Sequence, residues 1–323
     1  MLYLDSHSVT HLLNDALSLK LSEIAFKLHA TGQVDQPLRT IVRGAEQQLM
    51  GVMPAYIKSG PYQGFGLKSV VVKLGEAAKG PSHSGSVLIY DEPGAPPVMA
   101  VDAGAITQVR TASASAYATD LLANAQASRL AILGTGLQAR AHLLAMQSVR
   151  PINHVSIWGR NPRATRELGQ WIQSTCDLAV SVCASAAEAV HDRDIVCLTT
   201  AARSPIIRRS DLPRHCHVNA IGSSALGFQE LHEDVYQDSL LFTDCNQSVL
   251  AASECVIKAV NQGVLNPQGV GTEIGAVPTD RRWREEGGVT LFKSVGLAVQ
   301  DLVFSREVIR QWLASSACRH RPV

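Results

Sequence analysis

A stretch of small residues at positions 129–142, RLAILGTGLQARAH, combines residue types and spacing that suit a chemical role. Gly134, Gly136 and Ala139 match the pattern GxGxxA between an apolar, strand-like run and a helical pattern. In that pattern the first glycine permits a tight turn, the second lets the backbone approach a pyrophosphate, and the alanine lets the helix pack closely. The start of the helix adds N–H groups and a positive dipole. Such a motif also occurs as a plain tight turn, but its strand–turn–helix context favours dinucleotide binding.

The next strand-like run bears on which dinucleotide is used. NAD enzymes place an acidic residue about 20 residues further on, where it bonds the ribose 2′-hydroxyl. This chain reads VSIWGRNPRAT there, with Gly159, Arg160 and Asn161 at the place of the acid. An arginine attracts a 2′-phosphate, so the sequence favours NADPH over NADH. The alternative is that Arg160 is only a solvated loop cation.

Three basic residues lie near apolar runs in the first third of the chain. They are Arg39 in QPLRT, Lys68 in GFGLKSVVV and Arg110 in ITQVRTASA. Taken singly, each could be a surface cation. Lys68 stands out because it lies among Gly, Leu and Val, where a charge needs a partner. We regard the three as candidates for holding an anionic substrate.

The elements that must position these residues change character near residue 112. Before it come two helical patterns (about 7–30) and closely spaced strand-like runs that predict an antiparallel sheet. From 129 onward apolar strands alternate with helices, which is typical of a doubly wound parallel sheet. We interpret residues 289–313 as one amphipathic helix. The predicted fold class is α/β, with a Rossmann-type sheet at 113–298 and a second, α+β domain formed by 1–112 and 299–323.

Composition excludes several classes of function. The 323 residues carry a formal charge of +1, which argues against nucleic acid or an anionic membrane as the main partner. No apolar run approaches the roughly 18 residues of a membrane span, and we expect no signal peptide. Seven scattered cysteines without a CxxC pair favour reduced thiols and a cytoplasmic location. His215-Cys216-His217 lacks a third ligand, so we predict no metal site.

Taken together, these segments resemble the ornithine cyclodeaminase/mu-crystallin family. The matching stretches are PLRT, MPAYI, GLKSVVV, ITQVRTASASAYAT, ILGTGLQARAH, IWGRNPRA, AIGSSALGFQEL and LFKSVGLAVQD, in family order over nearly the whole chain. The resemblance implies a homodimer whose N-terminal domain carries the dimer sheet and the substrate pocket, completed by the C-terminal helix. It also implies hydride transfer to an imine beside a carboxylate.

The resemblance further implies roles for individual residues. Arg39 would pair with the substrate carboxylate, Lys68 would contact the substrate and could supply a proton, and Arg110 would bridge the carboxylate and a cofactor phosphate. The cofactor contacts would come from Gly136, Leu137 and Gln138 around the pyrophosphate, Thr199 along the groove, and Ser86, Val295 and Gly296 near nicotinamide and substrate.

One departure from the family pattern points to the substrate. Ornithine cyclodeaminases carry an aspartate that holds the substrate amine, and here Ser224 takes its place within Gly222-Ser223-Ser224-Ala225. A serine carries no charge and cannot hold an ammonium as a carboxylate does. The ketimine-reducing relatives also have serine. We therefore expect reduction of Δ1-pyrroline-2-carboxylate or Δ1-piperideine-2-carboxylate to L-proline or L-pipecolate, with Lys68 or a water held by Ser224 as proton donor.

Three other functions remain open from the sequence. The chain could be an alanine- or opine-type amino-acid dehydrogenase, an ornithine cyclodeaminase, or a low-turnover protein that binds NADPH and a small ligand.

Overall fold

The computed structural model describes residues 2–44, 48–73, 83–278 and 288–319 and divides into two compact units. Unit 1 comprises Met1–Arg110 and Leu297–Val323, and unit 2 comprises Thr111–Gly296. The first boundary falls inside helix α3 (Ala103–Leu122). Among the described residues, no helix is both long and apolar enough to cross a membrane.

Unit 1 is an α+β unit built around one sheet. Besides the first part of α3, its elements are β1 (Leu2–Leu4), α1 (Ser6–Leu12), α2 (Asp15–Ala30), β2 (Val34–Asp35), β3 (Thr40–Arg43), β4 (Gln48–Ile57), β5 (Gly64–Lys73), β6 (His83–Tyr90), β7 (Val98–Asp102) and α9 (Ala298–Arg319). The strand order is β1-β7-β6-β5-β4-β2, and β3 also pairs with β4. The sheet is antiparallel as predicted, except that β1 pairs parallel with β7 at one edge.

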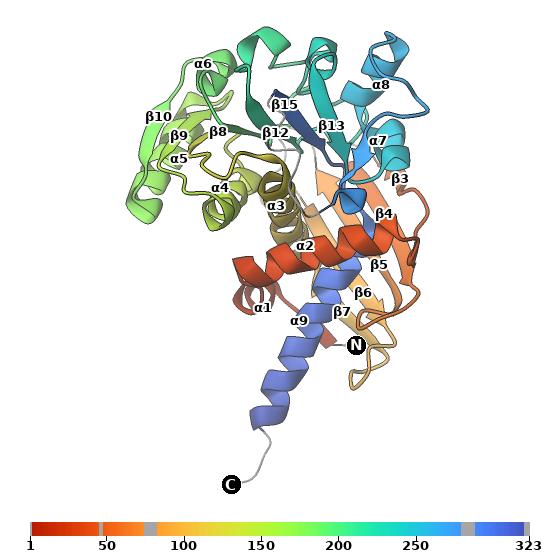
Figure 1. The fold of residues 1–323 in the computed structure, drawn as a ribbon. Helices are drawn as coiled ribbons and strands as arrows, with labels where there is room; N and C mark the ends of the chain where they lie inside the picture. Colours follow the sequence, from red (N-terminus) through yellow and green to blue (C-terminus); the bar gives the residue numbers. More distant parts are fainter. Residues whose placement is uncertain (1, 45–47, 74–82, 279–287, 320–323) are drawn as a thin grey trace. The chain divides into compact units, whose positions relative to one another are not determined.

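Helices α2 and α9 cover one face of this sheet. They pack against each other, and α9 also contacts β4, β5 and β6 (Figure 1). Helix α2 buries one face, with spacings of three and four residues between Ser18, Leu21 or Ser22, and Ala25 or Phe26. Side chains on β4 alternate between this covered face and the opposite face, as the period of two in a strand requires.

A buried ion-pair group anchors the middle of α9. The side chain of Arg306 is 0% exposed; its Nη1 donates to Glu92 Oε2 at 2.6 Å and its Nη2 to Asp91 Oδ1 at 3.0 Å. One turn further on, Arg310 Nε donates to the other oxygen of Glu92 at 3.1 Å. These contacts hold the helix on unit 1 independently of residues near its N-terminus.

Unit 2 alternates strands and helices, and its short 3-10 helices are labelled η. Its elements after α3 are β8 (Arg129–Leu133), α4 (Leu137–Val149), β9 (His154–Trp158), α5 (Pro162–Cys176), β10 (Ala179–Val182), α6 (Ala186–Val190), β11 (Ile195–Leu198), η1 (Arg209–Asp211), β12 (Cys216–Ala220), η2 (Glu233–Tyr236), β13 (Ser239–Thr243), α7 (Asn246–Ala252), α8 (Glu254–Asn261), β14 (Thr272–Glu273), η3 (Ile274–Ala276) and β15 (Val289–Lys293).

The sheet of unit 2 confirms the predicted Rossmann-type fold. All its strand pairs are parallel, in the order β10-β9-β8-β11-β12-β15-β13-β14. The chain proceeds from β8 outward through β9 to β10 and then crosses back to β11 on the other side of β8. The strand order therefore reverses between β8 and β11, and ligands of such sheets bind outside the carboxyl ends of the strands at that point.

Strand β15 corrects one prediction from the sequence. Residues 289–313 were expected to form a single helix, but Val289–Lys293 form a strand between β12 and β13, and α9 begins only at Ala298. The apolar residues Val289, Phe292 and Val295 have the spacing of a helical stripe, yet all five strand residues are buried. A short run buried on both faces has no period that separates strand from helix.

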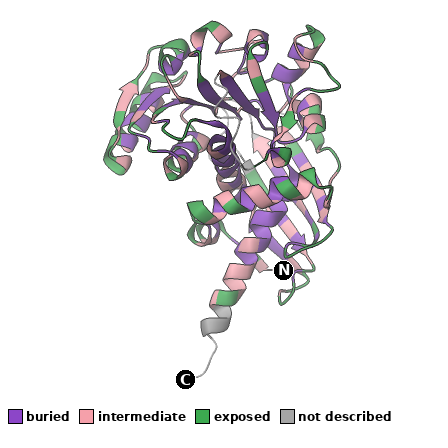
Figure 2. Ribbon diagram, in the orientation of Figure 1, coloured by how far each residue is buried: buried purple, intermediate pink, exposed green. Residues whose placement is uncertain are grey.

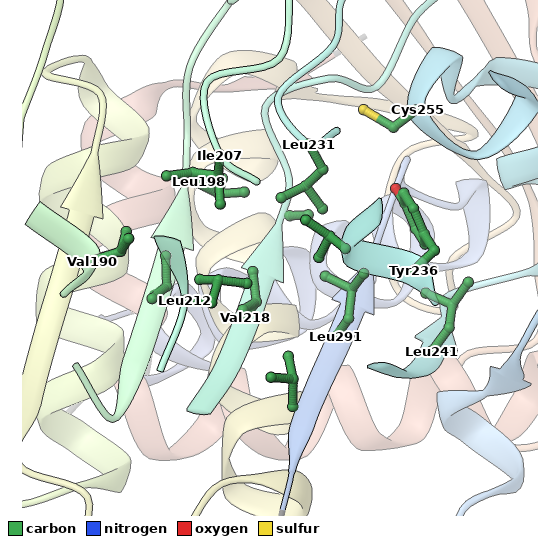
Figure 3. Close-up of a cluster of buried hydrophobic side chains, with 14 of the residues drawn as sticks. Val190, Leu198, Ile207, Leu212, Val218, Leu231, Tyr236, Leu241, Cys255 and Leu291 are labelled. Atoms are coloured by element: carbon green, nitrogen blue, oxygen red, sulfur yellow. The ribbon is translucent and has the colours of Figure 1, made fainter. Parts of the chain in front are cut away.

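The core of unit 2 lies against the central strands. Figure 2 colours these strands as buried, and Figure 3 shows Leu198, Val218 and Leu291 from β11, β12 and β15 among the buried apolar side chains. Tyr236 and Cys255 close the cluster from η2 and α8. This packing fixes the strands whose carboxyl ends carry the candidate site residues.

Candidate functional site

The glycine turn lies at the point where the strand order of unit 2 reverses. Gly134 follows β8 with φ of +114°, a conformation that favours glycine. A Cβ at this position would lie 2.6 Å from the carbonyl oxygen of Thr199, which follows β11. Thr199 in turn donates to the carbonyl of Leu133 through its backbone N (2.8 Å) and its Oγ1 (3.0 Å). Gly134 and Thr199 thus lie against each other at the carboxyl ends of β8 and β11.

The helix after this turn offers its N-terminus without a side-chain cap. Gly136 is the N-cap residue of α4 and makes no side-chain capping hydrogen bond. Leu137, the first helical residue, is 59% exposed, whereas Ala139 is fully buried against the unit. The amide of Ala139 donates to the carbonyl of Gly136 at 3.1 Å. The first amides of a helix lack the usual acceptor four residues earlier, and the helix dipole is positive here, so this end suits an anionic group.

The segment after β9 lies beside the same turn. A Cβ at Gly159 would lie 2.6 Å from Thr135 Cγ2, so this glycine lets the two loops pack together. Asn161 caps helix α5, because its Oδ1 accepts from the backbone N of Arg163 (3.0 Å) and of Ala164 (3.2 Å). Arg160 between them is exposed. No acidic residue occupies 159–161, so a phosphate meets no carboxylate on this segment.

A buried histidine fixes the first turns of α4. His142 Nδ1 lies 2.8 Å from the carbonyl oxygen of Gln138, which can only accept, and its Nε2 lies 2.9 Å from Ser115 Oγ on α3. Burial lowers the pKa of His142 from 6.5 to about 4, which keeps the ring neutral at pH 7. Nδ1 therefore carries the proton, and Nε2 accepts from the serine hydroxyl.

Two buried charged residues bind the backbone of the loop that carries Ser224. Lys293 Nζ, 0% exposed, donates to the carbonyls of Ala220 (3.0 Å) and Ser223 (2.9 Å). Glu230, also fully buried, accepts from Ser223 N at 3.0 Å and from the N and Oγ1 of Thr200 at 2.8 Å each. Burial raises the pKa of Glu230, and the nearby Lys293 opposes that rise. Ser224 itself is half-buried.

The turn between β15 and α9 has a similar support. Asp244 Oδ2 accepts from Ser294 Oγ (2.7 Å), Val295 N (2.9 Å) and Gly296 N (2.6 Å). Gly296 has φ of +86°, so the turn requires a left-handed residue at this position. One buried carboxylate therefore sets the path of the backbone through Val295 and Gly296.

Unit 1 brings together the basic residues singled out from the sequence. Lys68 on β5 is 3% exposed, and its Nζ lies 3.0 Å and 2.8 Å from the two carboxylate oxygens of Asp301 on α9. Arg110 on α3 donates to the same carboxylate, with Nε 3.2 Å from Oδ1. Arg39, half-buried just before β3, is close enough for its charge to act on Lys68.

The charge balance at this group affects Lys68. Burial lowers the pKa of Lys68 from 10.5 to about 8; the carboxylate of Asp301 raises it, and the cations of Arg110 and Arg39 lower it further. Lys68 and Arg110 share the one carboxylate of Asp301, so this group of three contacting side chains carries two positive charges and one negative charge. An anion placed against it would gain charge-assisted hydrogen bonds and would favour the protonated amine.

The structure thus gathers the predicted residues into two groups, one in each unit. In unit 2 they line the carboxyl edge of the sheet: Gly134, Gly136, Leu137, Gln138, Gly159, Arg160, Asn161, Thr199, Ser224, Val295 and Gly296. In unit 1, Arg39, Lys68 and Arg110 lie together, but Ser86 does not lie with them. Lys68 pairs with Val87 across β5 and β6, so alternation along β6 directs Ser86 to the opposite face of the sheet.

Sequence reasoning missed the buried acidic and basic residues that support these positions. Asp301, Asp244, Glu230 and Lys293 are each at most 1% exposed. The available signal was a charged residue inside an apolar run, as in LFKSV and AVQDLVF, where burial demands a partner.

The unit 2 edge fits a dinucleotide on its own geometry. The glycine at φ +114° leaves no room for a side chain beside Thr199, the α4 N-terminus lacks a side-chain cap, and the segment after β9 lacks an acid. The turn and the helix end match what a pyrophosphate requires.

Comparison with known proteins agrees with this architecture. The family model of the ornithine cyclodeaminase/mu-crystallin family matches residues 2–316. Ketimine reductase mu-crystallin of Mus musculus is 32% identical over 307 residues, which cover 94% of each protein.

Two solved structures extend the likeness to the fold. Thermococcus litoralis Δ1-pyrroline-2-carboxylate reductase, in complex with NADH and L-proline, superposes with a TM-score of 0.91 at 27% identity and covers 98% of each chain. An archaeal alanine dehydrogenase dimer with bound NAD superposes with a TM-score of 0.88 at 26% identity, covering 98% of this chain and 97% of the other. The chain therefore belongs to the ornithine cyclodeaminase/mu-crystallin family.

Proposed function

We propose that this chain is an NADPH-dependent reductase of cyclic imine carboxylates that converts Δ1-pyrroline-2-carboxylate, Δ1-piperideine-2-carboxylate or both to L-proline or L-pipecolate. The observation that carries this proposal is the cation group of unit 1. Lys68 and Arg110 share the single carboxylate of Asp301, and Arg39 lies close enough for its charge to act on Lys68. Two cations on one carboxylate leave positive charge for a substrate carboxylate.

The mechanism assigns binding and proton transfer to residues of this chain. Arg39 and Arg110 bind the substrate carboxylate and orient the ring, while Gly134, Gly136 and Thr199 hold the dinucleotide. When bound, NADPH supplies the hydride that reduces the imine carbon. Lys68 keeps a proton at Nζ near neutral pH, where it both attracts the carboxylate and can donate to the imine nitrogen.

Ser224 supports a cyclic imine over a diamine such as ornithine. Ornithine brings a second ammonium, and burying that charge without a carboxylate partner costs several kcal/mol. A cyclic imine acid brings no separate ammonium, so a neutral hydroxyl can bond its nitrogen or a water. The activities for which two relatives are named, ketimine reductase and Δ1-pyrroline-2-carboxylate reductase, support the same substrate class.

The preference for NADPH rests on this chain's own residues. Both solved neighbours are described with NADH or NAD, so they do not favour the phosphorylated cofactor. The support comes from exposed Arg160 and the lack of an acid at 159–161. We also propose that the protein acts as a homodimer, in keeping with the dimeric alanine dehydrogenase.

The test is a panel of substrates with each cofactor. Oxidation of NADPH and NADH is followed with the five- and six-membered imine acids and with pyruvate plus ammonia or methylamine. Ammonia release and proline formation are followed with ornithine plus NAD. We expect rapid turnover with a cyclic imine acid and no ammonia release from ornithine. Faster turnover with pyruvate and an amine would assign an amino-acid dehydrogenase instead, and steady production of proline from ornithine would assign a cyclodeaminase. Binding of NADPH without turnover of any substrate would indicate a binding protein.

Two Ser224 variants sharpen this test. Ser224→Ala should reduce the rate only moderately, because the cation group does most of the positioning. Ser224→Asp should depress imine reduction, since its carboxylate lies beside the negative group of the substrate. An imine reductase whose activity is unchanged by Ser224→Asp would show that Ser224 lies away from the substrate.

A further inference from the structure

The carboxylate of Asp301 joins three elements of unit 1 at the proposed substrate group. It lies on α9 with 0% exposure, and it contacts Lys68 Nζ from β5 and Arg110 Nε from α3 at 2.8–3.2 Å. Thr107 Oγ1 on α3 lies 3.5 Å from the same Nζ. Asp301 therefore links helix α9 to the two basic residues on β5 and α3.

The charges around Lys68 make this carboxylate decisive for the lysine. Among the described residues, the charged groups acting on Lys68 are Asp301 from α9, Arg110 from α3 and Arg39 from the segment before β3. Burial and both arginines favour the neutral amine, and Asp301 alone favours the ammonium. Loss of its charge would remove the carboxylate that opposes burial and the two arginines in setting the pKa of Lys68.

We propose that Asp301 is a positioning residue of the reductase site, which fixes Lys68 Nζ and Arg110 Nε against one carboxylate and keeps Lys68 protonated for the substrate. This inference rests on the proposed function, because it assigns Asp301 a task in binding an imine carboxylate. Asp301 acts through the two basic residues and does not itself contact the substrate.

A purely structural role is distinguishable because α9 has a second buried anchor. Glu92 is 5% exposed and accepts from Arg306 and Arg310 on the same helix. Glu92→Gln therefore removes one buried carboxylate partner of α9 without touching Lys68 or Arg110. It is the matched control for Asp301→Asn, which keeps the shape of the side chain and removes its charge.

The kinetic test is the pH profile of kcat/KM for the cyclic imine acid. Activity that needs protonated Lys68 falls as the pH rises through the pKa of Lys68. The fall of kcat/KM at high pH, the alkaline limb of the profile, therefore measures the pKa of Lys68. In Asp301→Asn the limb should move to lower pH by about 1–3 units, and kcat/KM at pH 8 should fall with it. Asp301→Glu keeps the negative charge, so the alkaline fall in activity should occur at the same pH as in the unmodified protein. This should hold even if the longer side chain moves Lys68 and lowers kcat. Glu92→Gln should lower the melting temperature and leave the limb in place.

A second readout does not depend on turnover. The side-chain amine of Lys68 is followed by NMR in protein carrying labelled lysine, with the signal assigned through Lys68→Arg. Its titration midpoint should lie near pH 8 in the unmodified protein and lower in Asp301→Asn. If no imine is reduced but this shift occurs, the proposed substrate is wrong and the role of Asp301 toward Lys68 stands. An unchanged alkaline limb together with an unchanged Lys68 titration would overturn the inference and leave Asp301 as an anchor of α9.

Discussion

Arg160 follows β9 at the position where NAD enzymes carry an acid, and its side chain is exposed to solvent. If it binds the 2′-phosphate, one charge-assisted contact contributes about 1.5–3 kcal/mol, or about tenfold to a hundredfold in preference. Arg160→Asp should therefore remove most of the preference for NADPH in kcat/KM and affect NADH less. Arg166→Asp, on an exposed position of α5, is the control and should change little. Equal efficiency with both cofactors in the unmodified enzyme would contradict this role.

Arg39 tests the carboxylate-binding role of the cation group. Arg39→Ala should raise the KM for the imine acid by about tenfold to a hundredfold, because the substrate loses one charge-assisted pair. The affinity for NADPH, measured by fluorescence titration, should stay the same. Arg43→Ala serves as the control, since Arg43 is an exposed cation on β3 close by in the sequence. A similar rise in KM in both variants would mean that Arg39 contributes only general positive charge.

The sequence predicted the basic residues of unit 1 better than their partner. Arg39, Lys68 and Arg110 are recognisable as basic residues beside apolar runs that also match family segments, and the structure gathers them. Asp301 ended the quoted segment LFKSVGLAVQD but was given no role, since a single aspartate in an amphipathic helix usually lies on the solvated face. Only the packing of α9 on the sheet shows that this position is buried. The register places Ser86 on the sheet face opposite Lys68, and its contact with the cofactor stays a prediction.

At the scale of the elements, the contact between α3 and α4 contains a pH-sensitive group. The folded chain binds a proton at His142 only near pH 4, whereas an ordinary histidine binds it near pH 6.5. The unfolded chain therefore holds more protons between these values, so stability is full above pH 6.5 and declines as the pH falls toward 4. The loss from this group is on the order of 3 kcal/mol.

Replacement of the histidine should flatten this decline. Urea unfolding of His142→Gln across pH 4–8 should show a smaller loss of unfolding free energy below pH 6.5 than the unmodified protein shows. His217, whose pKa burial lowers to about 3, remains in both proteins and contributes equally. His191→Gln changes an exposed histidine and should keep the original pH dependence. If the His142 variant keeps the original pH dependence as well, the pKa of His142 does not differ between the folded and unfolded chain.

The order of elements in unit 2 could be predicted from alternating apolar and helical runs, and the parallel sheet confirms it. The exception was β15, because Val289–Lys293 are buried on both faces and carry no alternation. Its insertion between β12 and β13 depends on contacts with strands 73 and 50 residues earlier in the chain, as in the pairs Asn219↔Phe292 and Phe242↔Phe292. A local pattern cannot report such distant pairing. Lys293 ends this strand, and Asp244 binds the backbone of Val295 and Gly296 just after it. Without the strand, the support that these two residues give to the site loops could not be predicted.

At the scale of the whole molecule, one face of the unit 1 sheet is rich in exposed apolar side chains. On the face opposite α9, Phe65 is 56% exposed, Val42 54% and Met50 39%. The strand register places Phe65 beside Tyr56, and Met50 beside both Val42 and Val71. Exposed apolar side chains gathered on one sheet face suit an interaction site, and the same face on a second copy suits a twofold dimer.

We predict that two copies of the chain associate through this face. A stable dimer buries about 800 Å² on each partner, so two lysines placed within the face should disfavour association by leaving charges without partners. Val42→Lys with Phe65→Lys should therefore convert a particle of about twice 34.6 kDa into one of 34.6 kDa, measured by light scattering during gel filtration. Val182→Lys, which changes an equally exposed apolar residue on β10 of unit 2, should leave the mass unchanged. Both lysine positions are already exposed in the single chain, so folding should survive, as circular dichroism can check. A folded double variant that keeps the mass of the unmodified protein would place the dimer interface elsewhere, and a monomeric unmodified protein would refute the dimer itself.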